Sequence, residues 1–167
     1  MKTLLIVRHA KSDWTHIGQS DYDRTLSERG LRDAPAMALR LKERSFMPDL
    51  IVASTAARAA ETARLLARGV GYDEERIQWE QDLYHAPAGL MRDILAQRPD
   101  TVNTLMLVAH NPGITDLANS FCGPLTDNVP TTGMAAFRLD LKHWADLYTA
   151  PATLFFYDYP KNGPGLS

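Results

Sequence analysis

The sequence predicts an α/β fold, a three-layer α/β/α sandwich with a mostly parallel central sheet. Three observations predict it: continuous apolar runs typical of buried strands, helix-forming segments between them, and turn residues at the boundaries. Strands and helices alternate through the first two thirds of the chain, which favours a parallel sheet covered by helices on both faces. With 167 residues in all, we expect one domain spanning residues 1–167.

Apolar runs and helix caps locate the elements of the first half. Residues 3–10, TLLIVRHA, form the first predicted strand, and residues 49–55, DLIVAST, form the second. Ser27 is the expected N-cap of the helix between them, and Thr55 that of the helix after the second strand, because hydroxyl side chains accept hydrogen bonds from free N–H groups there. The segment 11–25 is polar and rich in turn formers, so it is predicted to be a loop.

The second half continues the alternation and then breaks it. In order, the expected elements are a short strand at 76–79, a helix over 90–97, a strand at 104–110, a turn and helix at 111–121, and strands at 134–141 and 152–159. The last two strands follow one another without a helix between them. They therefore indicate a hairpin, with an antiparallel strand at one edge of the sheet.

Composition argues against several classes of protein. The 18 basic and 20 acidic residues give a formal net charge of -2, which disfavours a nucleic-acid-binding or anionic-membrane-binding surface. The single cysteine, Cys122, excludes an internal disulfide and is expected to lie in the core of a protein from a reducing compartment. No segment has the pattern of a signal peptide or the length of a membrane span. We therefore expect a cytoplasmic protein with neither nucleic acid nor membrane as a partner.

Residues suited to holding an anion follow three of the predicted parallel strands. Arg8 and His9 end the first strand, Arg58 lies just inside the helix after the second, and His110 ends the fourth. The carboxyl ends of parallel strands share one side of a sheet, where open α/β proteins bind ligands. Two of these positions are also helix N-termini, which favour negative charge. Because guanidinium groups bind phosphate oxygens bidentately, the pattern predicts a phosphoryl-binding pocket.

Four blocks in this chain order resemble the histidine phosphatase (phosphoglycerate-mutase-like) superfamily, and most of all its short branch, the SixA-type phosphohistidine phosphatases. The blocks are LLIVRHAKSDW, DRTLSERG, VASTAARAAETA and LMLVAHNPGI. The resemblance implies that His9 is the nucleophile that becomes phosphorylated, and that Arg8 and Arg58 hold the phosphoryl oxygens. It further implies that His110 contacts the phosphoryl group and its transition state.

The residue types suit this chemistry. A neutral imidazole attacks near pH 7 without a strong base, provided that an acceptor such as a backbone carbonyl holds its other ring nitrogen. Paired cations supply countercharge to a phosphoryl transition state. No HExxH or cysteine pattern accompanies the two histidines, so neither a metal nor any other cofactor is expected.

The chain departs from the family pattern at two places. The family motif is usually Arg-His-Gly, whereas Ala10 stands third here, and a positive φ would strain an alanine. Larger, mutase-like members carry a glutamate two residues after a leucine in the loop after the third strand, and the equivalent stretch here is LYH at 83–85. The candidate proton donors are therefore His85, Asp82 and Glu80, and for each the alternative is a solvated loop residue.

A weak general acid favours a substrate with a good leaving group. Phosphorylated imidazole leaves more easily than an alkoxide because its free nitrogen is protonated beforehand. The sequence therefore favours a phosphorylated protein carrying phosphohistidine as the substrate. The alternatives are a small phosphorylated metabolite, or a phosphate- or phosphoprotein-binding module with little turnover. Lys11 is the expected substrate contact at the pocket rim, and its alternative is a solvated loop in which Asp21 and Asp23 pair with nearby arginines.

Overall fold

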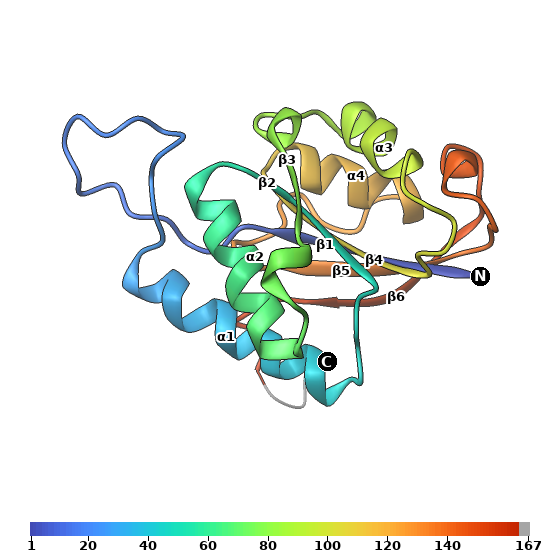
Figure 1. Cartoon of the computed structure of the whole chain (residues 1–167), viewed down its shortest axis with the longest axis horizontal. Helices are drawn as coiled ribbons and strands as arrows, with labels where there is room; N and C mark the ends of the chain where they lie inside the picture. The colour runs from blue at the N-terminus through green and yellow to red at the C-terminus, as the bar shows by residue number, and fades with distance from the viewer. Residues whose placement is uncertain (164–167) are drawn as a thin grey trace.

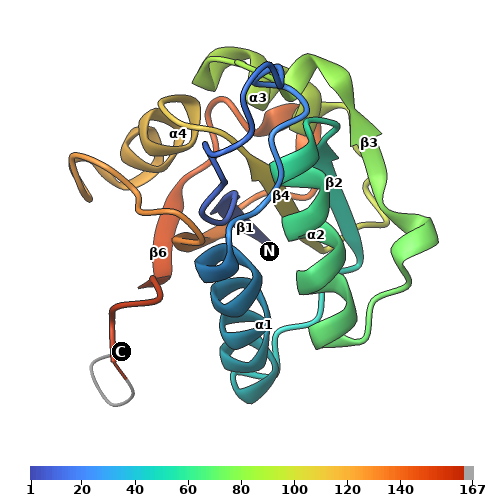
Figure 2. The ribbon, with the colours of Figure 1, turned by 90° about the vertical axis from the view of Figure 1, so that its left-hand side faces the viewer.

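The computed structural model describes residues 1–163, which fold into three layers (Figures 1 and 2). The strands are β1 (Lys2–Arg8), β2 (Leu50–Ser54), β3 (Gln78–Glu80), β4 (Thr104–Ala109), β5 (Met134–Leu139) and β6 (Ala152–Asp158). The helices are α1 (Glu28–Glu43), α2 (Ala57–Val70), α3 (Ala88–Ala96) and α4 (Gly113–Cys122), with short 3-10 helices η1 (Glu74–Arg76), η2 (Gln81–Leu83) and η3 (Trp144–Asp146). α1 and α2 cover one face of the sheet, and α3 and α4 cover the other.

The strand order of the six-stranded sheet is β3-β2-β4-β1-β5-β6. β4 pairs in parallel with β1 and β2, and β2 pairs in parallel with β3. β5 is antiparallel to both β1 and β6, so the expected hairpin lies at one edge of the sheet. The prediction of an α/β/α sandwich with a mostly parallel sheet and an antiparallel edge strand is confirmed.

The central position of β1 explains its uninterrupted apolar run. Leu4 and Ile6 pack into the core cluster on the side of α3 and α4. Leu5 and Val7 pack into the cluster on the side of α1 and α2. Because successive side chains of a strand point to opposite faces, a strand covered on both faces needs an apolar residue at every position. This run ends at the carboxyl edge of the sheet, where Arg8 pairs with Ala109 of β4.

One of the two predicted helix caps is confirmed. The Ser27 side chain accepts a hydrogen bond from the Gly30 N–H at the start of α1. The prediction for Thr55 was wrong, because α2 starts one residue later, with Ala56 as its N-cap and no side-chain cap. The Tyr22 hydroxyl instead donates to Thr55 Oγ1 at 2.6 Å. A contact with the loop before α1 has therefore replaced the local cap.

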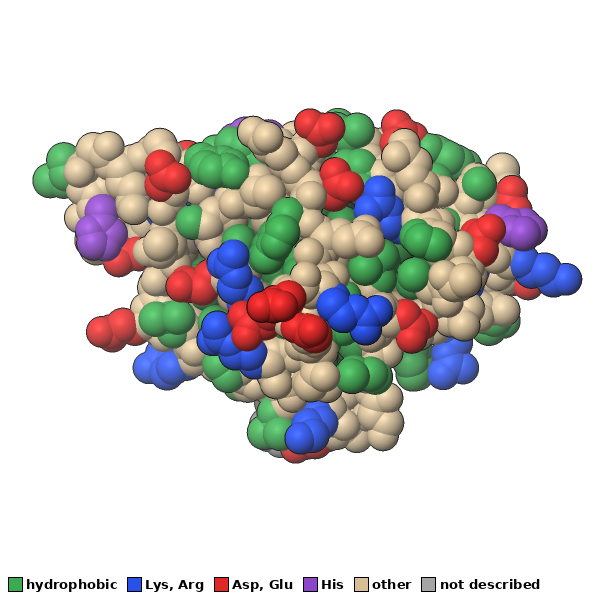
Figure 3. All heavy atoms as spheres, in the orientation of Figure 1, with side chains coloured by type: hydrophobic (Ala, Val, Ile, Leu, Met, Phe, Trp, Pro, Cys, Tyr) green, Lys and Arg blue, Asp and Glu red, His purple; other side chains and the backbone are tan. Residues whose placement is uncertain are grey.

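The prediction that Cys122 lies in the core was also wrong, because the residue is exposed. It is the last residue of α4, where the chain leaves the layer that packs on the sheet. None of the helices within residues 1–163 combines the length and the apolar character needed to cross a bilayer. On the face that Figure 3 shows, basic and acidic side chains are interspersed, with no continuous region of one sign.

A glycine permits the close approach of α1 and α2. A Cβ atom at Gly69 in α2 would lie 2.3 Å from the Cβ of Ala38 in α1. The substitution Gly69→Ala therefore forces the helices apart, and we expect the free energy of unfolding to fall by about 1–3 kcal/mol in urea titrations followed by circular dichroism.

Gly89, in the first turn of α3, provides the matched control. No atom lies within 4 Å of the Cβ that Gly89→Ala would add. This substitution gains helix propensity without a clash, so it should be neutral or stabilising by up to about 1 kcal/mol. The close packing of α1 on α2 would be contradicted if both substitutions changed stability equally.

Candidate active site

A pocket of about 330 Å³ opens at the carboxyl end of the parallel strands. Arg8 and His9 reach it from the end of β1, and Arg58 reaches it from the first turn of α2. His110 reaches it from the residue after β4. The structure thus brings together in one pocket four residues that span about a hundred positions of the chain.

His9 is held in one tautomer. Its Nδ1 lies 2.7 Å from the carbonyl oxygen of Ala10, and a carbonyl only accepts, so Nδ1 carries the proton. Nε2 therefore keeps its lone pair, toward which the Arg58 Nε–H points at 3.4 Å. Burial, and then the charges of Arg58 and Arg8, lower the pKa of His9 to about 3. The imidazole is therefore neutral near pH 7, and its free nitrogen lies beside a guanidinium group.

His110 has one ring nitrogen bonded and one without a partner. Its Nε2 lies 2.8 Å from Ser54 Oγ, whereas its Nδ1 is buried and has no hydrogen-bond partner within residues 1–163. The ring lies 5.2 Å from that of His9 between centroids. Burial, and then the charges of His9 and Arg58, lower the pKa of His110 to about 3. A buried polar atom left unpaired costs free energy, and a ligand atom in the pocket would satisfy it.

Arg8 and Arg58 give the pocket its positive charge. Arg8 Nη1 donates to the carbonyl oxygen of Val129 at 2.9 Å. Burial, and then the neighbouring charge of Arg58, lower the pKa of Arg8. Arg58 is only 5% exposed. Two cations that share a partly desolvated pocket repel each other, and an anion between them relieves that repulsion.

The loop 11–25 adds to the pocket the carboxylate of Asp21, which the sequence offered only as a partner of nearby arginines. Asp21 Oδ1 accepts from Arg24 Nη2 at 2.9 Å, and Asp21 Oδ2 accepts from Arg58 Nη2 at 3.1 Å and from the Tyr84 hydroxyl at 2.6 Å. The hydrogen bond from Tyr84, and then those of the arginines, hold the pKa of Asp21 far below its usual range. Asp21 thus pairs with nearby arginines, whereas Asp23 bonds to the Ser20 hydroxyl.

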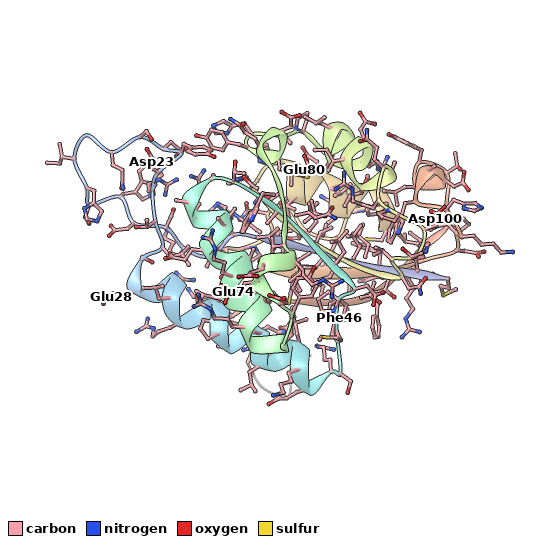
Figure 4. All side chains as sticks on the ribbon, in the orientation of Figure 1. Asp23, Glu28, Phe46, Glu74, Glu80 and Asp100 are labelled. Atoms are coloured by element: carbon pink, nitrogen blue, oxygen red, sulfur yellow. The ribbon has the colours of Figure 1, made fainter. Side chains whose placement is uncertain are left out.

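The three candidate proton donors lie in different surroundings. His85 lines the pocket, stacks on Tyr84 with ring centroids 3.9 Å apart, and places Nε2 4.0 Å from Asp21 Oδ2. Glu80, labelled in Figure 4 at the end of β3, pairs with Arg98 at 3.3 Å. Asp82 is exposed in η2. Neither Glu80 nor Asp82 is among the described residues that line the pocket.

The backbone accommodates alanine after His9 without a positive φ. Among the described non-glycine residues, positive φ values occur at Ser45, His85 and Thr132, and not at Ala10. Ala10 is fully buried, and its N–H donates to Thr62 Oγ1 at 2.9 Å. The departure from the Arg-His-Gly motif therefore carries no backbone strain. Lys11, the next residue, is exposed and lines the pocket as expected.

The two helix starts offer the pocket fewer free donors than the sequence suggests. The Ala57 N–H in α2 donates to the Tyr22 carbonyl at 3.0 Å. The Thr115 N–H in α4 donates to Asn111 Oδ1 at 3.1 Å. The pocket groups that are suited to an anion are therefore mainly side chains. Within residues 1–163 no group of three or more His, Cys, Asp or Glu side chains is arranged to hold a metal ion.

Comparison with known proteins points to one family. The model of the histidine phosphatase superfamily, branch 1, matches residues 4–113. An uncharacterized protein of Mycobacterium tuberculosis is 31% identical over 165 residues, which cover 93% of this chain and 100% of that protein. The structure of SixA from Agrobacterium tumefaciens is 29% identical with a TM-score of 0.79, covering 95% of this chain and 99% of that one. The protein histidine phosphatase SixA complexed with tungstate also has a TM-score of 0.79, at 20% identity over 96% and 98% of the two chains.

The two buried histidines make stability depend on pH. Their pKa values are about 3 in the folded protein, against 6.5 for an unperturbed histidine. Between these values the unfolded chain binds more protons than the folded chain. The free energy of unfolding should therefore fall as the pH is lowered from about 6.5 toward 3, by up to about 1 kcal/mol per pH unit for each histidine.

Urea unfolding across this pH range measures the effect. His9→Asn removes one of the two groups and should make stability depend less steeply on pH. His16→Asn is the matched control, because the His16 side chain is 61% exposed, lies outside the pocket lining, and its removal leaves both buried histidines in place. A His9→Asn variant with the wild-type slope would show that His9 is not held neutral by the fold.

Proposed function

Because the chain belongs to the histidine phosphatase superfamily, branch 1, we propose that it hydrolyses phosphorylated substrates through a covalent phosphohistidine on His9. The observation that carries the proposal is the tautomer of His9. Its Nδ1–H is committed to the Ala10 carbonyl, so the lone pair on Nε2 is free beside the Arg58 guanidinium. A buried, neutral imidazole with a cation at its reactive nitrogen is suited to attack an anionic phosphoryl group.

In the first step the phosphoryl oxygens lie against Arg8 and Arg58, and His9 Nε2 attacks phosphorus. The N–P bond forms as the bond from phosphorus to the leaving group breaks, and its electron pair departs with the leaving group. The two guanidinium groups oppose the negative charge on the equatorial oxygens. His85 is the candidate that protonates the leaving group, because it lines the pocket.

His110 is proposed to donate from Nδ1 to a phosphoryl oxygen. This requires the proton on Nδ1, and hence an acceptor role for Nε2 toward Ser54. The Ser54 hydroxyl is able to donate, because its oxygen already accepts from the Ala56 N–H at 3.2 Å and its own proton is free. The phosphoryl oxygen would then satisfy the ring nitrogen that has no partner within residues 1–163.

In the second step water attacks the phosphorus of phospho-His9. The new O–P bond forms as the N–P bond breaks, and the electron pair of that bond returns to Nε2. Water contributes its oxygen to inorganic phosphate, and the proton it loses passes to the phosphate or to solvent. The cycle needs no redox step and no further reactant.

Protein phosphohistidine is the proposed substrate class. Within residues 1–163 the pocket lining brings no carboxyl group that is free to protonate a leaving group, since Asp21 is held by Arg24, Arg58 and Tyr84, and an imidazole leaving group needs less help from an acid than an alkoxide does. Trp14 lines the pocket and is 71% exposed, which suits the approach of a protein surface. The Agrobacterium SixA carries a provisional assignment as a phosphohistidine phosphatase. We place this activity in the cytoplasm.

Two alternatives use the same pocket. A small phosphorylated metabolite would react by the same mechanism, because the arginines bind the phosphoryl group and not its carrier. A phosphate- or phosphoprotein-binding module with little turnover would need only the cations. A binding module does not explain the fixed tautomer of His9, because binding a phosphate does not require a free lone pair on Nε2.

Phosphate trapping tests the mechanism. Wild-type protein incubated with a labelled phosphodonor and quenched in alkali should carry a phosphoramidate on His9 that is lost in acid. His9→Ala should lose this label and reduce kcat/KM for p-nitrophenyl phosphate by at least about 10³-fold, because the nucleophile is gone. His16→Ala, at an exposed histidine outside the pocket lining, should behave as wild type. Equal rates for wild type and His9→Ala would remove the assignment.

A substrate panel tests the substrate class. A phosphohistidine peptide, phosphoramidate, p-nitrophenyl phosphate and common sugar phosphates are ranked by kcat/KM. We expect the phosphohistidine peptide to exceed the sugar phosphates by at least about 10²-fold, because its leaving group needs little help from an acid. Comparable values for the peptide and a sugar phosphate would favour the metabolite alternative.

A further inference from the structure

We propose that Asp21 is a positioning residue that holds the Arg58 guanidinium against His9, an inference that rests on the phosphatase function proposed above. Asp21 comes from the loop 11–25, which extends past the start of α2 in Figure 1. It lies 37 positions from Arg58 in the chain. The sequence pattern offered for Asp21 only an ion pair in a solvated loop.

Asp21 holds Arg58 at two points on the outer side of the guanidinium group. Arg58 Nη1 donates to the Asp21 carbonyl oxygen at 2.8 Å, and Arg58 Nη2 donates to Asp21 Oδ2 at 3.1 Å. The third nitrogen, Nε, is left to donate to His9 Nε2 at 3.4 Å. Because a guanidinium group is planar and rigid, two fixed nitrogens determine where the third one points. The contacts with Asp21 therefore set the position of the cation at the reactive nitrogen.

Asp21 is itself held from two other directions. The Tyr84 hydroxyl donates to Oδ2 at 2.6 Å, and Arg24 Nη2 donates to Oδ1 at 2.9 Å. Tyr84 follows η2. The Asp21 carboxylate, which lies in the loop 11–25, therefore bonds both to α2, through Arg58, and to the segment before α3, through Tyr84. The pKa of Asp21 lies far below its usual range, and the group stays ionised through the range in which enzymes operate. It serves as a fixed acceptor and does not donate a proton to the leaving group.

Arg58 needs such a restraint because of Arg8. The two cations share the pocket, and the charge of Arg58 already lowers the pKa of Arg8. Without Asp21, repulsion favours rotamers that carry the Arg58 head away from Arg8 and from His9. The substrate would then have to order a long, flexible side chain at the moment of reaction. Asp21 orders it beforehand, and displacement of a catalytic group by about 1 Å costs on the order of 10²-fold in rate.

The test compares variants of the whole chain for phosphotransfer. In Asp21→Asn the shape and the backbone carbonyl remain and the charge is lost, so kcat should fall about 10-fold. In Asp21→Ala the side-chain contact is lost as well, and kcat should fall about 100-fold. KM should change little in both, because the misplacement acts on the transition state more than on binding. Rapid-quench measurement of phospho-His9 formation should show the same loss, with the thermal unfolding midpoint near that of wild type.

Asp23→Asn is the matched control. Asp23 lies in the same loop, is labelled in Figure 4, and bonds through its side chain to Ser20 at 2.8 Å. This variant should keep the kcat and KM of wild type. Tyr84→Phe removes the hydroxyl that donates to Asp21 and keeps the aromatic ring, over which Arg58 Cζ lies at 5.9 Å from the centroid, so it should lower kcat to a smaller extent. The double variant Asp21→Asn, Tyr84→Phe should be no slower than Asp21→Asn alone, because both act through one carboxylate.

The outcomes separate this inference from the function on which it rests. A wild-type protein that forms phospho-His9 while Asp21→Asn keeps wild-type kcat overturns the positioning role alone. A fall in kcat that only accompanies a lower unfolding midpoint, or that Asp23→Asn reproduces, also overturns it. A wild-type protein that neither forms phospho-His9 nor turns over any substrate of the panel refutes the proposed function, and the positioning role with it.

Discussion

The hydrogen bond from His9 Nδ1 to the Ala10 carbonyl determines what the rest of the pocket is able to do. It fixes the proton on one ring nitrogen and leaves the other with a lone pair, which Arg58 Nε approaches. Burial keeps the ring neutral, because an imidazolium among guanidinium groups would be strongly disfavoured. The fold holds this arrangement rigidly, since the His9 N–H and carbonyl oxygen are bonded to Ala109 and Thr132 on either side of β1.

The pocket balances an excess of cations against one carboxylate. Arg8 and Arg58 lie at the end of the sheet with Arg24 and Lys11 beside them, and Asp21 is the acidic side chain that lines the described pocket with them. Repulsion among cations raises the free energy of the empty site and makes the entry of a dianion favourable. Asp21 opposes the repulsion that would displace Arg58, because it bonds to Arg58 Nη1 and Nη2. It leaves Arg58 Nε directed toward His9. The cations therefore attract an anion, and the contacts with Asp21 keep Arg58 ordered in the empty pocket.

The sheet topology explains why residues so far apart in sequence meet. β1 lies between β4 and β5, so the residues that follow β1 and β4 are neighbours at the carboxyl edge of the sheet. β2 lies on the far side of β4 and delivers Ser54 to His110 and, through the turn into α2, Arg58 to His9. The antiparallel strand β5 enters from the opposite direction, and the segment before it supplies the Val129 carbonyl that holds Arg8. The parallel strands thus present Arg8, His9, Arg58 and His110 to the pocket, and the segment before the antiparallel strand completes one of its walls.

The sequence by itself predicted the strands, the three layers and the meeting of Arg8, His9, Arg58 and His110. Apolar runs are local patterns, and their alternation with helices implies parallel strands whose carboxyl ends share one edge of the sheet. The sequence also predicted Ser27 as the N-cap of α1, because this cap is a hydrogen bond between residues three positions apart, from the Gly30 N–H to Ser27 Oγ. Only the tertiary structure decided that Thr55 bonds to Tyr22 and not to its own helix, that Cys122 is exposed, and that His85 and not Glu80 faces the pocket. The same holds for Asp21, whose partner Tyr84 is 63 positions away. The physical reason is that a polar loop side chain has many available partners, and packing between distant elements selects among them.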